Sequence, residues 1–234
     1  MANIDPIRRA EIGREKRAKT RAQLVAAASA LFARQAVESV TVDDVIREAD
    51  VAKGTFYVHF KDLHALIVAV SDELVASIDE LLQPVRLSIA DPAQRIAYGC
   101  SCFIDKALSE PAWAGLVARM AATVGQGGEV ARRRLYEDLK ENAKRLPRDG
   151  ASAELNLVVV VGILLQVLGA IAEGRLSSRH REGALAAILR AIGVDARQVK
   201  SVLGRLPVRA DAARAEAARK AKAPPRRAAS GRHA

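Results

Sequence analysis

Residues 41–60 read TVDDVIREADVAKGTFYVHF, a stretch in which two short amphipathic helical patterns meet around a tight break. Thr41 is a good N-cap, and the carboxylate of Asp44, three residues later, falls in the positively polarised first turn of the helix. Asp50 occupies the break, where we expect a positive φ that Asp tolerates better than a branched residue does. A second short helix follows over about 52–58, so the stretch predicts a helix-turn-helix.

Apolar residues at helical spacing flank this motif on both sides. Those between Leu24 and Phe32 predict a helix against which the motif packs. The same period runs from Leu63 to Leu81, which predicts a long helix that bridges two domains and ends near Pro84. The expected helices cover about 16–33, 41–48, 52–58, 63–83, 91–108, 111 to the glycines at 125–128, 129–146, 152–173, 180–192 and 196–206.

Short signals mark where several of the later helices begin. Asp91, Pro92 and Gln94 have the spacing of a cap, a first helical residue and a capping-box partner. Pro111 starts the next helix, and Ser152 caps a later one.

The composition indicates an all-α protein. Of 234 residues, 50% are hydrophobic and only 3% are aromatic, and the apolar residues are mostly Ala, Leu, Val and Ile. This length accommodates one large domain or two smaller ones. We expect a flexible basic arm over 1–15, a helix-turn-helix domain over 16–65, a helical ligand-binding and dimerisation domain over 66–206, and a disordered basic tail over 207–234.

The excess positive charge lies at the two ends of the chain. The formal net charge is +10, and residues 1–21 carry seven Lys or Arg against three acids, while residues 205–234 carry nine against two. The residues between them carry 21 basic and 22 acidic side chains. Basic ends are attracted to phosphates by counterion release. The alternative for the tail is a solvated, disordered terminus without a partner.

Two features bear on the compartment. Cys100 and Cys102 point to different sides of a helix, so they predict neither a local disulfide nor a metal clamp, and a reducing cytoplasm fits them. The first residues lack the pattern of a secretory signal. The apolar run over 155–172 is at the lower length limit of a membrane span and has polar interruptions, so we favour a buried helix.

The motif resembles that of the TetR family of bacterial transcriptional regulators. The matching residues are Thr41, Val42, Ile46, Ala49, Val51, Lys53, Gly54, Thr55, Phe56, Tyr57, His59, Phe60, Leu63 and Leu66. Asp50 stands where that family usually has Gly. The resemblance implies a homodimer in which each chain has a three-helix DNA-binding domain, a long fourth helix and a larger helical domain. Dimerisation would use the last two long helices, expected here at about 152–173 and 180–192.

The resemblance also implies which residues contact DNA. Thr41 would hold a phosphate with its hydroxyl and its amide. Gly54 would let the backbone approach the duplex, and Lys53 would reach the groove. We expect Phe56 and Phe60 in the core beneath the recognition helix. The expected contacts from this domain are Thr41, Lys53, Gly54, Thr55, Tyr57, His59 and Lys61.

Charge alone cannot hold this domain on DNA, because residues 22–66 carry four basic against six acidic side chains. We therefore hypothesise that the preceding arm supplies much of the affinity through minor-groove or backbone contacts. The alternative is that the arm extends the first helix and pairs some charges with Glu11 and Glu15. The basic residues concerned are Arg8, Arg9, Arg14, Lys16, Arg17, Lys19 and Arg21, of which we assign Arg14, Arg17 and Arg21 to the DNA-binding site.

Four of the eight aromatic residues lie in the expected DNA-binding domain, and the other four fall between residues 98 and 136, as in an apolar ligand cavity between helices. Aromatic residues at helical spacing are also ordinary core, and that alternative stays open. Gln166 would anchor a ligand or the dimer seam, or is a buried, satisfied glutamine. Gly162 and Gly169 share its stripe and allow another helix to approach. The expected ligand contacts are Tyr98, Phe103, Trp113, Met120, Tyr136 and Gln166.

These patterns predict a cytoplasmic, sequence-specific DNA-binding regulator, and the resemblance implies a repressor that a small apolar ligand releases from its operator. The alternative is a sequence-tolerant architectural DNA-binding protein whose C-terminal domain only dimerises. Hydrolase, zinc-protease and phosphate-loop motifs are missing from the sequence, and the four histidines lack metal-ligand spacing. We therefore expect no enzymatic activity and no cofactor.

Overall fold

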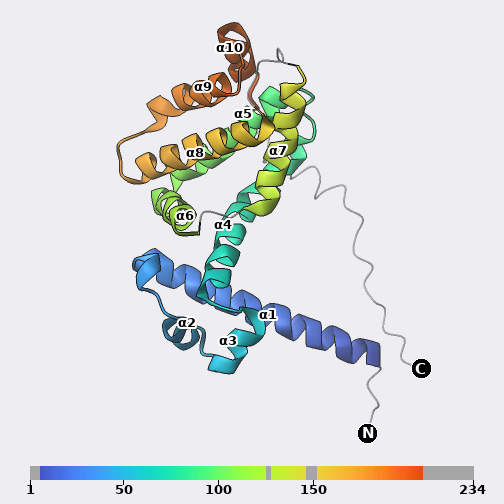
Figure 1. The fold of residues 1–234 in the computed structure, drawn as a ribbon, viewed down its shortest axis with the longest axis vertical. Coiled ribbons are helices and arrows are strands. Elements are labelled where there is room, and N and C mark those ends of the chain that lie inside the picture. Colours follow the sequence, from blue (N-terminus) through green and yellow to red (C-terminus); the bar gives the residue numbers. More distant parts are fainter. Residues whose placement is uncertain (1–5, 125–127, 146–151, 208–234) are drawn as a thin grey trace, which may run out of the picture.

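The computed structural model describes residues 6–124, 128–145 and 152–207, and the regular structure within them is entirely helical (Figure 1). The helices are α1 (Pro6–Arg34), α2 (Val42–Ala49), α3 (Lys53–His59), α4 (Leu63–Arg86), α5 (Pro92–Ser109), α6 (Pro111–Val124), α7 (Glu129–Ala143), α8 (Ala153–Ala172), α9 (Arg181–Ala191) and α10 (Ala196–Gly204), with 3-10 turns at Val37–Ser39 and Ser178–His180. The first three form an N-terminal domain, and α4 runs from it into a C-terminal domain of the others. The predicted all-α class is confirmed.

The start and the end of α2 follow the local signals in the sequence. The Thr41 amide and hydroxyl donate to Asp44 Oδ2 at 3.0 and 2.7 Å, and the Asp44 amide donates back to Thr41 Oγ1 at 3.2 Å. This reciprocal capping box closes the first turn. At the other end Asp50 has a φ of 50° and a ψ of 52°, as expected for the break before α3.

The N-terminal domain has its own hydrophobic core. Leu24 and Phe32 of α1 pack with Phe56 of α3 and Leu66 of α4, and all four are fully buried. Phe60 joins them, so the predicted inward direction of the two phenylalanines is confirmed. Helix α6 of the C-terminal domain also contributes to this core, through Leu116 and Met120. The two domains are therefore packed together through α6 as well as connected by α4.

The flexible arm expected over 1–15 is wrong for residues 6–15, because α1 begins at Pro6. Proline is favoured as a first helical residue, and the Arg, Lys, Glu and Ala that follow are strong helix formers. Arg8 and residues 10–19 are exposed. Figure 1 shows this half of α1 projecting past α3 without a helix packed against it.

Two expected helix ends and one expected capping partner also differ. Helix α4 continues through Pro84 to Arg86, because Arg86 is held from outside the helix by Asp138 of α7. Helix α7 ends at Ala143 rather than near 146. Gln94 is not a capping-box partner, since Asp91 caps α5 through the Ala93 amide and Gln94 instead donates to the Arg205 carbonyl at 2.7 Å. The expected tail, beyond Pro207, lies outside the described residues.

Asp50→Gly should stabilise the protein, because a non-glycine residue in the left-handed region costs about 1 kcal/mol or more in native strain. Part of this gain is offset by the entropy of glycine in the unfolded chain, so we expect an increase of about 0.5–1 kcal/mol in the free energy of unfolding of the N-terminal domain. Urea denaturation measures it. Asp50→Ala, the matched control, should lower stability instead, and a stabilising Asp50→Ala would contradict the argument.

Candidate nucleic-acid interface and internal cavity

Helix α3 presents three different faces. Phe56 and Phe60 are buried beneath it, Thr55 and His59 are half-buried at its side, and the outer face is exposed. That outer face carries Lys53, Gly54, Tyr57, Val58 and, just beyond the helix, Lys61. Tyr57 is 51% exposed and Val58 72%, so two sizeable side chains project from the domain rather than pack within it. Three of the contacts predicted in this segment thus lie on the exposed face of α3, Lys61 follows just beyond the helix, and Thr55 and His59 lie at its side.

Gly54 is not required by the fold of its own chain. A Cβ built on it meets nothing within 4 Å, and its φ is not positive. Glycine within a helix costs about 1 kcal/mol relative to alanine. Since nothing inside the domain requires a glycine at this position, Gly54 fits a backbone that must lie close to a partner surface.

Two acidic residues at the start of α2 engage the expected DNA-binding groups. Lys53 Nζ lies 3.0 Å from Asp43 Oδ1, an exposed ion pair that joins α2 to α3 and raises the pKa of Lys53. The Thr41 hydroxyl and amide are both occupied by Asp44, and these hydrogen bonds lower the pKa of the Asp44 carboxyl. In the protein alone, Thr41 therefore lacks the free donors that the sequence-based hypothesis assumed.

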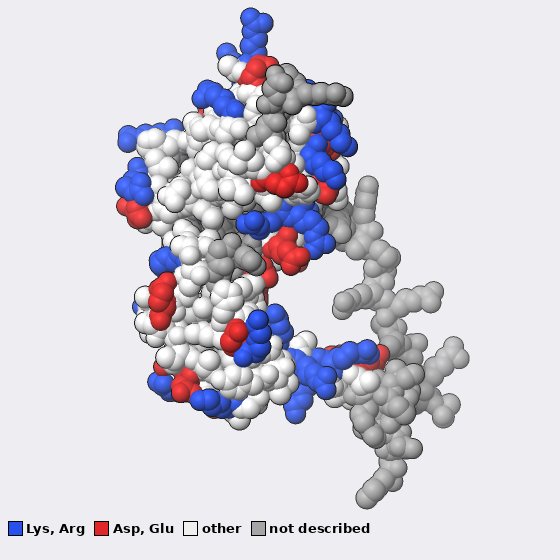
Figure 2. All heavy atoms as spheres, viewed as in Figure 1, with Lys and Arg blue, Asp and Glu red and all other residues white. Residues whose placement is uncertain are grey.

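The projecting half of α1 adds a basic surface next to this interface. The Arg21 guanidinium carbon lies 5.1 Å from the centroid of the Phe60 ring, which places α1 beside the C-terminal end of α3. Arg14 and Arg17 are exposed further along α1. Figure 2 shows the positive side chains gathered on this projecting segment. The alternative pairing of arm charges with Glu11 and Glu15 does not occur among the described side chains, although the arm does extend the first helix.

Val58 is a surface residue that the sequence analysis did not single out. It lies between Tyr57 and His59 but is more exposed than Tyr57 or any other large apolar residue of the N-terminal domain. The signal was present in the sequence, because Phe56 and Phe60 define the inward stripe and Val58 falls on the opposite side of a helix.

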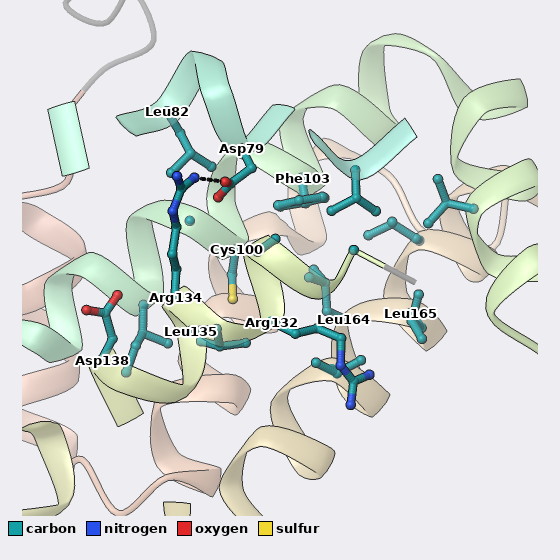
Figure 3. A pocket seen from close by; sticks show the side chains of 18 of the residues that line it. Asp79, Leu82, Cys100, Phe103, Arg132, Arg134, Leu135, Asp138, Leu164 and Leu165 are labelled. Atoms are coloured by element: carbon teal, nitrogen blue, oxygen red, sulfur yellow. Dashed lines mark hydrogen bonds and ion pairs between the residues drawn. The ribbon is translucent and has the colours of Figure 1, made fainter. Parts of the chain in front are cut away.

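A cavity of about 370 Å³ lies in the C-terminal domain between α4, α5, α6, α7 and α8. This volume falls in the range of about 300–1,000 Å³ that is usual for small-molecule sites. Most of the wall is apolar, with Leu82, Phe103, Val117, Leu135, Leu165 and Leu168 among its residues (Figure 3). The thiol of Cys100 also faces it, and burial raises the pKa of that thiol to about 12, so it stays neutral.

Charged groups occupy one part of the cavity wall. Arg134 of α7 forms an ion pair with Asp79 of α4, drawn as a dashed line in Figure 3. Burial raises the pKa of Asp79, and Arg134 opposes that shift. Deeper along the same helices, Asp138 accepts from Arg86 at 2.6 Å and from Arg95 at 2.8 Å. These pairs tie α4, α5 and α7 to one another at the edge of the cavity.

The N-terminus of α7 is fastened to α4 beside the same cavity. The Gly128 amide donates to Asp72 Oδ1 at 2.7 Å. Gly128 has a φ of 64°, and a Cβ on it would lie 2.7 Å from Val75 Cγ1. Only glycine fits here, for reasons of both backbone conformation and space.

Of the six expected ligand contacts, Phe103 lines the cavity and the other five do not. Tyr98 is buried in a separate cluster with Ile78 and Leu82, where burial raises its pKa. Met120 lies in the core of the N-terminal domain, and Trp113 packs against Phe103 with ring centroids 6.3 Å apart. The two polar residues lie outward, since Tyr136 donates to Glu154 at 2.6 Å and Gln166 is exposed.

The polar residues of the cavity wall had a recognisable signal in the sequence. Ser71, Asp79 and Arg86 interrupt the apolar stripe of α4, and Asp79 is 5% exposed. A polar residue that keeps to the buried face of an otherwise apolar stripe needs a partner, and here α7 provides it. The clustering of aromatic residues was a weaker signal for the cavity wall, because only Phe103 of that cluster lines the cavity.

Helix α8 is apolar but only partly covered. By length and composition it would suffice to cross a membrane, with a mean hydropathy of 2.5, yet only 28% of that window is buried within the protomer. The expected buried helix is therefore wrong for the single chain. Leu155 is 53% exposed and Val158 is 64% exposed, and Gly162 and Gln166 continue the same exposed stripe. Figure 2 shows few charges on the part of the surface where α8 lies.

Comparisons with known proteins agree with this architecture. Residues 24–70 match the family model described as bacterial regulatory proteins, tetR family. The crystal structure of RolR in complex with resorcinol superposes with a TM-score of 0.57 at 23% identity, covering 83% of this chain and 98% of that one. A fatty acid degradation regulator, FadR from Bacillus halodurans, superposes with a TM-score of 0.55 at 14% identity, covering 72% and 94%.

A third structure is more similar in sequence. It is a TetR-family transcriptional regulator from Pectobacterium atrosepticum, 27% identical, with a TM-score of 0.50 and coverage of 76% of this chain and 92% of that one. The first two similarities bear on the fold alone, while the family model covers the three-helix domain and the start of α4. Residues 24–70 therefore match the DNA-binding domain of the tetR family of bacterial regulatory proteins, and the chain shares the all-helical fold of these solved structures.

Proposed function

We propose that this protein is a cytoplasmic transcriptional repressor that binds a palindromic operator as a homodimer and leaves it when a small molecule occupies the internal cavity. The observation that carries the proposal is the double role of α4. Its first half supplies Leu66 and Val70 to the core beneath the recognition helix, and its second half supplies Asp79 and Arg86 to the cavity wall. One rigid element thus touches both sites.

In this proposal α3 enters the major groove with its exposed face. Lys53 and Tyr57 contact phosphates or base edges, Gly54 allows close approach, and Val58 lies against a thymine methyl group. The basic half of α1 extends past α3 by about 20 Å, at 1.5 Å per helical residue, and follows the DNA backbone. Its exposed positive charge compensates for the acidic residues at the start of α2.

The second copy of the chain is proposed to cover the apolar stripe of α8. Helix α9 packs against α8, and its own outer face carries the small residues Gly183 and Ala187 (Figure 1). Burying large exposed apolar side chains is favourable by about 25 cal/mol per Å². A twofold pairing of these helices would leave the α3 helices of the two chains free for successive turns of one duplex.

Ligand release requires that cavity occupancy and operator binding oppose each other. A ligand that prefers the DNA-free arrangement weakens operator binding, typically about 5–150-fold. The operator must then weaken ligand binding by the same factor. Besides α4, the α6 helix connects the two sites, since Val117 and Ala121 line the cavity while Leu116 and Met120 lie in the N-terminal core.

The operator is the first test of the function. Genomic fragments retained by the purified protein give the site, and fluorescence anisotropy against random duplex measures its specificity. A repressor should prefer its operator by about a thousandfold or more. Equal affinity for both would support the architectural alternative.

Lys53→Ala should weaken operator binding by about tenfold or more, the effect usual for a lost groove contact. Asp43→Asn should strengthen it, because the change removes a negative charge from the interface and frees Lys53 from its ion pair. The matched control is Lys200→Ala on α10, an exposed lysine of the other domain. Unchanged affinity in both Lys53→Ala and Asp43→Asn would exclude α3 from the interface.

A double variant with Arg14→Gln and Arg17→Gln should lower the salt dependence of operator binding. Each lost phosphate contact reduces the slope of log affinity against log salt concentration by about 0.9, so the two substitutions in both chains of the dimer should reduce it by about 3.6. Arg133→Gln with Arg197→Gln, both exposed in the C-terminal domain, is the control and should leave the slope unchanged. Identical slopes in the two double variants would show that α1 does not contact the backbone.

Leu155→Glu should convert the dimer to a monomer at micromolar concentration, because it places a charge on the stripe that the second copy covers. Leu81→Glu on α4 changes a side chain of similar exposure, 59%, outside that stripe, and should leave the dimer intact. Sedimentation equilibrium distinguishes the two. A monomeric unmodified protein, or dissociation by both variants, would refute the proposed interface.

A further inference from the structure

The cavity wall carries more positive than negative side chains. Four arginines line it, at positions 86, 95, 132 and 134, against the two acids Asp79 and Asp138. A buried or half-buried charge is costly unless an opposite charge or hydrogen-bonding groups accompany it. The partners of each arginine therefore decide what charge a ligand must bring.

Three of the four arginines already have acidic partners. Arg86 and Arg95 share Asp138, and Arg95 also pairs with Glu141 of α7. Arg134 pairs with Asp79. Both acids of the wall are consequently engaged by guanidinium groups, so a cationic ligand would have to displace an arginine to reach them.

Arg132 is the exception. Within residues 6–124, 128–145 and 152–207 it has neither an ion pair nor a side-chain hydrogen bond. It is half-buried and lines the cavity from α7, and Figure 3 shows its guanidinium apart from the pair of Asp79 and Arg134, beyond Leu135 in that view. Guanidinium groups bind carboxylates through two parallel hydrogen bonds.

We propose that the cavity takes an amphipathic carboxylate, with its acid group on Arg132 and its apolar body among Phe103, Val117, Leu165 and Leu168. The proposal rests on the ligand-responsive function proposed above and replaces its general apolar ligand with an anionic one. Among the described residues no acid pairs with Arg132, and the apolar wall requires that the rest of the molecule be a hydrocarbon chain or ring.

The test uses the full-length protein and pairs of probes that differ only in the head group. Octanoate, decanoate and phenylbutanoate are each compared with the corresponding primary alcohol and primary amine by isothermal titration calorimetry at neutral pH. At least one carboxylate should bind about tenfold or more tightly than its alcohol, and the amines should bind most weakly.

Arg132→Met keeps most of the apolar stem and removes the charge, so it should abolish the preference for carboxylate while alcohol affinity changes by less than about twofold. Arg132→Lys should restore part of the preference. Arg133→Met is the matched control, because Arg133 is exposed on the same helix, is not part of the cavity wall and should have no effect. Alcohols that bind as tightly as carboxylates, a preference for amines, no binding by any carboxylate at millimolar concentration, or a preference that persists in Arg132→Met would each overturn the proposal.

The same probes separate this proposal from the regulatory one. Carboxylates that bind through Arg132 but leave operator affinity unchanged would support the anionic site and refute release by the ligand. An alcohol that binds as tightly as its carboxylate and releases the operator equally well would refute the anionic site and support the regulation.

Discussion

The two halves of helix α4 are held in place by contacts with different parts of the protein. Near its start, Leu66 and Val70 are fixed in the core beneath α3. Further along the helix, Asp79 and Arg86 are fixed by ion pairs to α7. A helix held in this way transmits displacement along its length, because its backbone hydrogen bonds resist bending far more than side-chain contacts resist sliding. The proposed relation between the interface and the cavity therefore depends mainly on α4, with α6 as a second connection.

The interface itself is a compromise between folding and binding. The carboxylates of Asp43 and Asp44 hold α2 and α3 in place through Lys53 and Thr41, but they also present negative charge where DNA phosphates would come. Exposed pairs of this kind contribute little stability, so their exchange for phosphate contacts has a low energetic cost. In the proposed complex the net attraction then comes from elsewhere, and the exposed basic half of α1 lies beside α3, where we propose that it follows the DNA backbone.

The ion pairs at the cavity differ from the exposed pairs of α2 and α3 in their burial. Its ion pairs are partly or largely shielded, and Arg86 and Arg95 have side chains only 13% exposed. A shielded pair is costly to break because the remaining charge is left without a partner. These pairs therefore keep α4, α5 and α7 in register around an otherwise apolar space, and an additional arginine in the wall remains available to a ligand.

The sequence by itself determined the elements whose causes are local. The cap at Thr41, the left-handed residue at Asp50 and the inward Phe56 and Phe60 follow from hydrogen bonds and periodicities within a few residues, and so the helix-turn-helix was predictable. The sequence did not determine the extent of α1, because a basic N-terminal segment fits a flexible arm as well, although its residues are good helix formers.

Only the tertiary structure decided where the cavity lies and what lines it. Met120 and Phe103 fall at similar positions of amphipathic helices, yet one lies in the N-terminal core and the other faces the cavity, because helix packing places those faces against different neighbours. The pairing of Asp79 with Arg134 and the lone guanidinium of Arg132 likewise depend on side chains brought together from helices distant in sequence. The polar residues on the apolar stripe of α4 are visible in the sequence but their partners are not, so only the folded arrangement of α4 and α7 reveals the contacts.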